Sequence, residues 1–366
     1  MSWSPELPYN DLPPLPPKQD LETVPVLKAL VPAASELSGL KEALVSLPNP
    51  TVFVNSLALL EAQASSEIEN IVTTTDELFR ADTTREADVS PATREARRYK
   101  VALFQGQAHM YERAGLLTAG MAEEVCTEIR GTVTGIRQGD GTFIGNPRTE
   151  RRIYTPPTGK AVIEAKLQNW AEFVNEETDL DPLIQMAVAH YQFEAIHPFD
   201  DGNGRTGRIL NVLMLVAKEL LQEPILYISQ YINQHKNDYY RLLNAVTESG
   251  AWENWIIYML RAVETTARST RLKIKEIQRL QQKFDERLVS DIGLQYPANL
   301  SDVLFRQPYC RVKDVMAGCE VSRPTATKYL NALVEADMLR VLQAGREKLY
   351  VNVHFMRILQ ATDSDM

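Results

Sequence analysis

The chain has 366 residues, too many for one average domain, and its 44% hydrophobic and 24% charged residues are ordinary for globular proteins. A formal net charge of −9 argues against a protein that coats nucleic acid over its whole surface, but it does not exclude a small basic face. No apolar run reaches membrane-spanning length and the three scattered cysteines lack paired metal spacing, so we expect two or three domains of a reduced, cytoplasmic protein without a membrane partner.

Residues 1–20 include the run Leu-Pro-Pro-Leu-Pro-Pro, which cannot be helical and predicts an extended arm. The arm is either a proline-rich ligand for another protein or a segment packed on its own domain, and a single short run favours the second. After Pro50 the chain becomes helical. Residues 57–70 hold good helix formers, and Thr73–Asp76 interrupts the pattern.

Residues 91–130 predict two helices, after which glycines and β-branched residues become frequent. Within this change we expect a β-hairpin with the arms Thr142–Ile144 and Arg151–Thr155, joined by a turn at Gly145–Pro147. Two prolines, Pro156 and Pro157, close it.

The helical pattern resumes after the hairpin. Helices are expected at Ala161–Asn175 and Pro182–Ala195. A third, Thr206–Leu221, is apolar all round from Ile209 and is therefore expected to be buried. Trp252–Leu288 predicts one or two long helices, whose later part is rich in Lys, Arg and Glu and suits a connector.

From about residue 298 the sequence predicts a separate small unit. We expect a short helix at Val312–Met316, a turn at Gly318–Val321 and a helix at Ser322–Ala336 with Ser322 as its N-cap. Leu339–Leu342 and Lys348–Val351 would form a hairpin around Gly345. Helix, turn, helix and β-hairpin in this order are typical of a winged helix.

The segment His197–Arg208 (HPFDDGNGRTGR) concentrates chemical groups between two predicted helices. Its glycines let backbone N–H groups converge on an anion at a helix N-terminus, and Arg205 and Arg208 share one face of the first turn. Asp201 offers Mg²⁺ a carboxylate beside these phosphate-binding groups, and a neutral His197 can accept a proton from an attacking hydroxyl. The segment therefore predicts phosphoryl or nucleotidyl transfer from a metal-bound nucleotide.

Each of these residues also has a plain structural interpretation. A histidine before proline can simply end a helix, and a glycine-rich turn with arginines can be an ordinary helix entry. The complete string makes that interpretation improbable.

The same segment resembles the signature of the Fic family, His-Pro-Phe-x-Asp/Glu-Gly-Asn-Gly-Arg-x-x-Arg, with every defining position matched. Fic proteins are mostly AMP-transferases, which move AMP from ATP to a Ser, Thr or Tyr hydroxyl of a target protein. The resemblance implies that His197 deprotonates this hydroxyl, that Asp201 holds Mg²⁺ against the α- and β-phosphates, and that Phe199 anchors the loop. It implies ATP contacts from Gly202, Asn203, Gly204, Arg205 and Arg208.

The resemblance extends outside the signature. The Doc branch, which phosphorylates its target, carries Lys at the position of Gly204, so this glycine favours AMP transfer. The hairpin at 142–155 corresponds to the family's flap, which would pair with the target backbone as an added strand. Candidates for lining the adenine pocket are Tyr239 and Tyr240, with Gln192 and Gln234 as secondary candidates, and ordinary packing is the other interpretation of all four.

Ser65, Glu69 and Asn70 stand far upstream, with Ser65 and Glu69 one helical turn apart. Alone they describe a solvated helix. In the Fic family, however, Ser/Thr-x-x-x-Glu-Gly/Asn marks an inhibitory helix whose glutamate pairs with the second signature arginine, here Arg208, and so occupies the group meant for the γ-phosphate. In some relatives the same glutamate supports removal of AMP from the target, and the sequence leaves both roles of Glu69 open.

Residues 301–366 hold nine Lys/Arg and eight Asp/Glu, a net charge of about +1. The basic and hydroxyl side chains expected on the recognition helix and wing are Arg323, Thr325, Thr327, Lys328, Arg346 and Lys348. DNA binding through residues 312–350 and a structural or dimerisation role both fit this charge. The second function that we consider is therefore a DNA-binding regulator with a nucleotide-sensing core. A sensor would not need His197, so this histidine favours the enzyme.

The expected fold is mainly α-helical, with a Fic-type core, a β-hairpin flap and a small α+β winged helix. We expect an arm and inhibitory region at 1–95, a catalytic core at 96–265, a helical connector at 266–297 and the winged helix at 298–366. The expected ligands and partners are ATP with Mg²⁺ and a target protein bound along the flap. The sequence does not decide whether the protein forms a homodimer.

Overall fold

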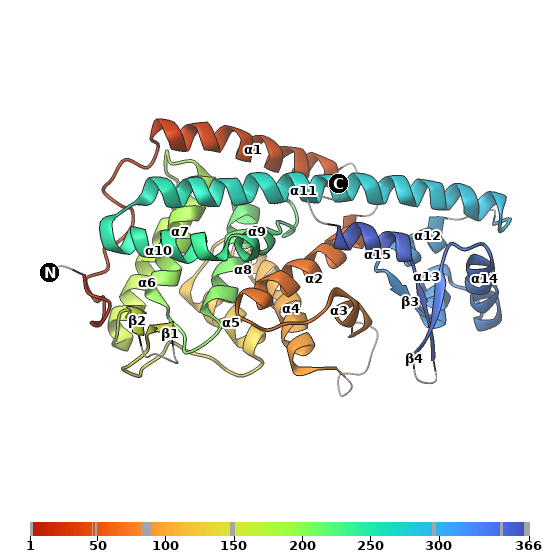
Figure 1. Ribbon diagram of the computed structural model, residues 1–366, viewed down its shortest axis with the longest axis horizontal. Helices are drawn as coiled ribbons and strands as arrows, with labels where there is room; N and C mark the ends of the chain where they lie inside the picture. Colours follow the sequence, from red (N-terminus) through yellow and green to blue (C-terminus); the bar gives the residue numbers. More distant parts are fainter. Residues whose placement is uncertain are drawn as a thin grey trace.

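The computed structural model describes residues 3–45, 47, 50–81, 89–146, 151–294, 298–344 and 347–361. Helices dominate this part of the chain, which confirms the mainly α fold. The longest, α11 (Trp252–Ser290), has 39 residues and runs from the helical core to the C-terminal unit (Figure 1). It is one continuous helix over the range where one or two were predicted. None of the described helices is long and apolar enough to cross a membrane.

Helix α1 (Val24–Val45) lies along α11 and is absent from the sequence-based prediction (Figure 1). Its buried side chains recur at helical spacing: Val26, Ala33, Leu37, Leu40 and Leu44. Glu36 of α1 forms ion pairs with Arg268 and Arg271 of α11 at 3.0 and 2.7 Å. Pro32 inside α1 removes one backbone donor, which obscures the helical pattern in the sequence.

The core around the motif consists of α2 (Pro50–Ile68), α3 (Thr75–Ala81), α4 (Pro91–Glu112), α5 (Ala119–Arg130), α6 (Lys160–Asn175), α7 (Pro182–Ile196), α8 (Asn203–Ala217), α9 (Ile228–Gln234) and α10 (Lys236–Ser249). The predicted helices at 91–130, Ala161–Asn175 and Pro182–Ala195 are confirmed as α4 to α7. Helices α7 and α8 are buried on nearly all sides and pack against each other. Together they position the motif between them.

Four core helices differ from the prediction. Helix α8 begins at Asn203 instead of Thr206 and ends at Ala217 instead of Leu221, because the glycine-rich motif itself forms the first turn. Helices α9 and α10 lie in a segment for which no element was predicted. The helix predicted at 57–70 begins earlier, at Pro50, and ends at Ile68.

The hairpin consists of β1 (Ile144–Asn146) and β2 (Arg151–Tyr154), paired antiparallel with an irregularity between Ile144 and Gly145. The predicted first arm was wrong, because the strand starts at Ile144 and includes two residues that were assigned to the turn. Gly145 suits this strand position, since a Cβ atom there would lie 2.2 Å from the backbone oxygen of Arg151. Pro147 of the predicted turn lies outside the described residues.

The N-terminal arm packs on its own chain, as the favoured interpretation had it. The backbone N–H of Tyr9 donates to the oxygen of Thr155 at 3.0 Å, directly after β2. Asn169 of α6 accepts from the N–H of Leu15 at 2.7 Å and donates to its oxygen at 3.0 Å. The arm therefore ties the end of the hairpin to α6.

The C-terminal unit contains α12 (Ala298–Phe305), β3 (Tyr309–Cys310), α13 (Val312–Cys319), α14 (Arg323–Glu335), β4 (Arg340–Ala344), β5 (Glu347–Val351) and α15 (Val353–Gln360). Its strands form an antiparallel sheet in the order β3-β5-β4. Ser322 caps α14 as predicted, by accepting from the N–H of Thr325. The predicted first helix and hairpin are present, with α13 longer than expected, and Gly345 lies outside the described residues.

Candidate functional site

The signature loop joins α7 to α8 through two left-handed backbone positions, His197 (φ 49°) and Gly202 (φ 89°). Phe199 is completely buried beneath the loop. The side chain of Asn203 accepts from the N–H of Phe199 and donates to its oxygen, both at 2.8 Å. The Asn203 amide therefore holds the loop closed, which leaves its backbone N–H, at the start of α8, as the group able to meet an anion.

His197 lies half-buried at the C-terminus of α7. Its Nδ1 atom is buried and makes no hydrogen bond to the described residues. Burial, together with the positive charge of Arg137, lowers the pKa of His197 to about 4. The imidazole is therefore neutral at physiological pH and can accept a proton.

Asp201 is the candidate metal ligand, and its carboxylate is largely exposed at the N-terminal end of α8. One of its oxygens accepts from the N–H of Gly202 at 2.7 Å, and the carboxylate lies 3.6 Å from nitrogens of both Arg130 and Arg205. Mg²⁺ usually takes one or two carboxylates and completes its shell with phosphate oxygens and water, so a single accessible carboxylate beside a phosphate site fits it. Among the described residues, no cluster of three His, Cys, Asp or Glu side chains forms a metal cage.

Arg205 is almost completely buried and binds a carboxylate that the sequence did not suggest. Its guanidinium donates to Glu95 of α4. Glu95 stands about 110 residues before the arginine in sequence, and nothing in its local sequence distinguishes it from other helix-surface glutamates. Only the packing of α4 on α8 brings the two together.

Arg208 is held by the end of α2, as the predicted Glu69 pairing requires. Its Nε donates to the Ser65 hydroxyl at 2.8 Å, and its Nη2 donates to the backbone oxygen of Ser65 and to Glu69 Oε1, both at 2.9 Å. Burial acts to raise the pKa of Glu69, but the charge and hydrogen bond of Arg208 outweigh it and lower that pKa. The carboxylate is therefore ionised at neutral pH, and Arg208 keeps its charge.

Gly204 allows Glu69 to come this close to α8. A Cβ atom at position 204 would lie 2.5 Å from Glu69 Oε1 and 2.9 Å from an Arg208 nitrogen. A side chain here would displace the carboxylate from the arginine. The glycine thus serves the contact with Glu69 as well as the backbone of the anion site.

Helix α2 ends in a way that fixes Glu69. Asn70 adopts a left-handed conformation (φ 63°), and the N–H of the next residue, Ile71, bonds back to the oxygen of Ser66 at 3.0 Å, which terminates the helix. Lys236 of α10 donates to the backbone oxygen of Ile68. Asn70, which we predicted as one of the inhibitory residues, therefore lies at the C-terminal end of α2.

The two candidate tyrosines have different surroundings. Tyr239 is buried, and its hydroxyl lies 2.8 Å from His190 Nε2 in an aromatic cluster. Tyr240 is 43% exposed and lines a largely apolar pocket of about 120 Å³ between α7, α10 and the hairpin, beside Glu194 and Ile153. Of the two tyrosines, Tyr240 lines this pocket and Tyr239 is packed behind it.

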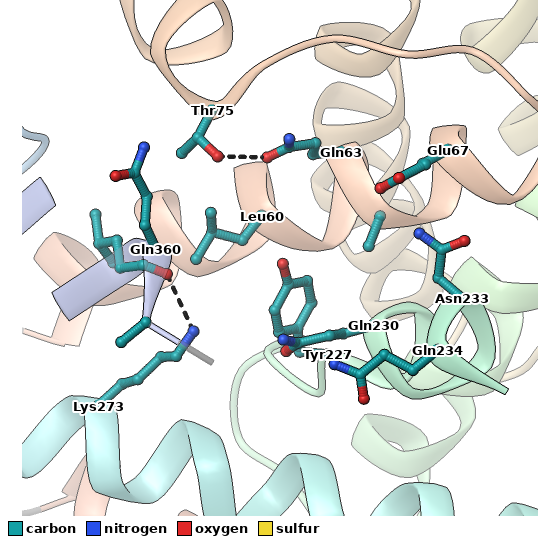
Figure 2. Close-up of a pocket in the computed structure, with 13 residues that line it drawn as sticks. Leu60, Gln63, Glu67, Thr75, Tyr227, Gln230, Asn233, Gln234, Lys273 and Gln360 are labelled. Atoms are coloured by element: carbon teal, nitrogen blue, oxygen red, sulfur yellow. Dashed lines mark hydrogen bonds between the residues drawn. The ribbon is translucent and has the colours of Figure 1, made fainter. Parts of the chain in front are cut away.

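The two candidate glutamines lie elsewhere. Gln192 is buried and donates to the backbone oxygen of Pro13 at 2.8 Å, so it holds the N-terminal arm. Gln234 lines a separate polar cavity of about 240 Å³ between α9, α2 and the end of α15. Figure 2 shows Gln234 with Gln230 and Asn233 across this cavity from Gln63. The cavity touches a face of α2 different from the one that carries Ser65 and Glu69.

Two further residues escaped the sequence-based prediction. Arg137, between α5 and the hairpin, is buried and donates to backbone oxygens of the signature loop. Glu61, two helical turns before Glu69 in α2, is buried and accepts from Tyr99 and Ser229. Glu61 could have been found from the sequence, because a carboxylate within an apolar helix segment is unusual. The sequence around Arg137 has no comparable feature.

Comparison with known families gives three matches along the chain. The Fic/DOC family matches residues 121–215, which include the signature loop. The Fic/DOC family N-terminal region matches residues 27–108, which include α2 and Glu69 directly after it. The C-terminal domain of SoFic-like protein adenylyltransferases matches residues 280–355.

Curated relatives match over a short stretch. Protein adenylyltransferase fic-1 of Caenorhabditis elegans is 42% identical over 65 residues, which are 17% of this chain and 13% of that protein. Protein adenylyltransferase Fic of Drosophila yakuba is 35% identical over 95 residues, 25% of this chain and 18% of that protein. The chain therefore matches less than a fifth of the length of these relatives.

Solved structures share the fold over a larger part. A Fic family protein from Desulfovibrio desulfuricans G20 superimposes with a TM-score of 0.54 and 22% identity, over 92% of this chain and 98% of that one. Fic-1 of C. elegans gives a TM-score of 0.52 and 17% identity, over 69% of this chain and 74% of that one. At these identities the comparison shows a common fold.

Proposed function

We propose that this chain, which belongs to the Fic/DOC family, transfers AMP from ATP to hydroxyl groups of target proteins. The observation that carries the proposal is the signature loop, which brings a neutral His197, an accessible Asp201 and two buried arginines to one helix N-terminus. The protein adenylyltransferase names of the matched C-terminal family and of the curated relatives support the same activity.

His197 is the base of the proposed reaction. Its imidazole takes the proton of a target Ser, Thr or Tyr hydroxyl while the hydroxyl oxygen forms a bond to the α-phosphorus. The bond between this phosphorus and the α–β bridging oxygen breaks, and pyrophosphate leaves with the bonding electron pair. Arg205, Arg208 and the N–H groups at the start of α8 would stabilise the charge on the phosphates.

Asp201 would hold Mg²⁺ together with phosphate oxygens, and the ion would supply charge neutralisation on the departing pyrophosphate. Tyr240 would line the adenine site, whereas Gln192 and Gln234 are better assigned to the arm and to the cavity behind α2. We place the enzyme in the cytoplasm, in keeping with its free cysteines.

The end of α2 acts as an autoinhibitor in this proposal. Glu69 and Ser65 together take up the Nε and Nη2 donors of Arg208, so those donors cannot meet a γ-phosphate while α2 stays in place. The target protein would pair along β1, because the N-terminal arm already contacts Thr155 at the end of β2.

We expect Glu69→Gly to raise AMP transfer severalfold or more, because it frees Arg208 for the nucleotide. Incubation with ATP labelled at the α- or the γ-phosphate, followed by mass spectrometry of the protein, measures which group is transferred. AMP transfer retains only the α-label. Glu67→Gly, a neighbouring exposed glutamate of α2, is the matched control and should leave the rate unchanged.

Two results would contradict the proposal. Retention of the γ-label would indicate a kinase, and no label in the Glu69→Gly protein would exclude both transfers. Equal labelling by wild type and Glu69→Gly would refute the inhibitory role alone and leave the transferase activity standing.

The regulator alternative has less support. We assign the C-terminal unit a winged-helix plan, with α14 as the helix that would enter DNA, but its charge of about +1 gives no strong basic face. A gel-shift assay over a range of salt concentrations would detect DNA binding if this unit had that role.

A further inference from the structure

Arg137 makes an unusual set of contacts with the signature loop. Its Nε donates to the backbone oxygen of His197 at 2.7 Å, its Nη2 lies 3.4 Å from the oxygen of Ile196, and its own N–H donates to the oxygen of Pro198 at 3.0 Å. One residue thus binds three successive carbonyl groups centred on the catalytic histidine. The first of these carbonyls ends α7 and the other two follow it, where the helix leaves such groups without intrahelical partners.

The backbone at His197 needs such support. A left-handed conformation is rarely adopted by a residue with a side chain, and it persists where surrounding contacts determine it. The fork of a guanidinium fixes the direction of several acceptors at once, which a single-point donor such as lysine cannot do. Arg137 therefore sets the direction of the His197 peptide and, through it, the position of the imidazole.

Arg137 also joins the loop to the hairpin. Its Nη2 donates to the backbone oxygen of Pro157, shortly after β2. The segment that leaves the hairpin and the loop that carries His197 are thus bound to the same buried side chain. A target hydroxyl presented along the hairpin would be placed relative to the base by this link.

The charge of Arg137 is not neutralised by an ion pair with any described residue. Its side chain is buried, with 3% of the residue exposed, and carbonyl oxygens solvate the guanidinium. The positive charge therefore acts on the neighbouring imidazole. The other charges that act on His197 are Glu69, from the end of α2, and Asp201, from its own loop, and both oppose the effect of Arg137.

We propose that Arg137 is a positioning residue for the catalytic base, which fixes His197 relative to the hairpin. The proposal rests on AMP transfer as the activity, but its first test does not use that activity. Arg137→Gln removes both the positive charge and the forked set of guanidinium donors. Arg137→Lys keeps the charge but loses the forked donors.

The first measurement is an NMR titration of the His197 imidazole without substrates, assigned with His197→Ala among the five histidines of the chain. In Arg137→Gln we expect the pKa of His197 to rise above about 4, because a nearby positive charge is lost, while burial, the larger cause, still holds it below its ordinary value. In Arg137→Lys it should stay low. Hydrogen exchange of residues 196–204 should speed up in both variants.

The second measurement is AMP transfer in the Glu69→Gly background. Both Arg137 variants should lose about 100-fold in kcat, since a small misplacement of a base has an effect of this order, while the KM for ATP changes by less than about threefold. The matched control is Arg113→Gln at the end of α4, an arginine whose side chain also donates to a backbone oxygen, that of His109, and pairs with Glu124. It should keep the parent values.

An unchanged His197 titration and unchanged loop exchange in Arg137→Gln would overturn the proposal, as would a kcat loss equal to that of Arg113→Gln. If the parent protein transfers no AMP, the transferase proposal fails, and the titration and exchange still decide the role of Arg137. Circular dichroism and melting check each variant, and Arg137→Lys serves alone if Arg137→Gln does not fold.

Discussion

At the scale of single residues, His197 owes its chemistry to where the chain places it. The left-handed backbone turns the residue out of α7, and burial removes water from one side of the ring. An imidazolium in this position would lose hydration and face Arg137, so the neutral form is favoured. The residue is therefore suited to accept a proton over a wide range of pH.

This environment predicts an unusual acid limb for the reaction. A base works only when deprotonated, so activity should be lost as the pH falls through the pKa of His197, which is lowered to about 4, and not near the ordinary 6.5. The pH dependence of kcat/KM in the Glu69→Gly protein measures this. Loss of Glu69 removes a group that raises the pKa of His197, so the limb should not move upwards.

His197→Ala is the companion variant, with transfer reduced by at least about 100-fold and ATP binding retained. An acid limb at pH 6 to 7 would contradict the assigned environment. Transfer at the parental rate by His197→Ala would contradict the role of the base.

At the scale of elements, α2 is attached to the core by more than its contact with Arg208. Glu61 accepts from the N–H of Ser229 at 3.2 Å and from its hydroxyl, and from the Tyr99 hydroxyl at 3.1 Å. These contacts bind the helix to α4 and to the start of α9. Burial raises the pKa of Glu61 to about 7, although these hydrogen bonds act to lower it.

This raised pKa predicts a pH-dependent stability. The folded state favours the protonated carboxyl, so the contribution of Glu61 is present below its ordinary pKa and is lost as the pH rises through about 7, an effect of about 3 kcal/mol. Glu61→Gln cannot ionise and should lack this dependence. Urea unfolding at pH 5 and pH 8 compares the two proteins.

Glu67→Gln, on an exposed position of the same helix, should behave as wild type. If Glu61→Gln loses as much stability as wild type between the two pH values, Glu61 is already ionised in the folded protein.

At the scale of the whole molecule, segments distant in sequence pack against the helical core. Lys273 of α11 donates to the oxygen of Leu359 in α15 at 3.0 Å, and Ser56 of α2 donates to the oxygen of Arg306 at 3.1 Å, so the C-terminal unit rests against α11 and α2 (Figure 1). At the other end, the N-terminal arm holds the hairpin. The helices around the signature loop thus lie between the N-terminal arm and the C-terminal unit (Figure 1).

The arm provides a test of this arrangement. Asn169→Ala removes two hydrogen bonds to Leu15, a loss of about 1 to 2 kcal/mol of local stability. Hydrogen exchange should then increase in the arm at 9–15 and at the end of the hairpin near 152–158, which the arm contacts. Gln168→Ala, on the neighbouring exposed position of α6, is the control, and equal exchange in the two variants would show that the arm does not support the hairpin.

Much of the fold follows from local signals. The spacing of apolar residues predicted α4 to α7, and the Ser322 cap predicted the start of α14. Helix α1 was missed because Pro32 interrupts its pattern. Helices α9 and α10 were missed because they are held by packing against α2 and α11, which are distant in sequence or follow later in the chain. The first hairpin strand was misplaced because glycine and asparagine usually signal a turn, whereas close approach of Arg151 favours glycine here.

The sequence by itself determined the chemical groups of the site and their order, because the signature loop is contiguous and a helix N-terminus needs only local glycines to bind an anion. It also suggested that Glu69 meets Arg208. Only the tertiary structure decided that Arg205 binds Glu95, that Gln192 binds the N-terminal arm while Gln234 lines a separate cavity, and that Arg137 holds His197. These contacts join residues far apart in the chain. Their energies depend on burial, which is set by the packing of distant segments and cannot be read from a local sequence pattern.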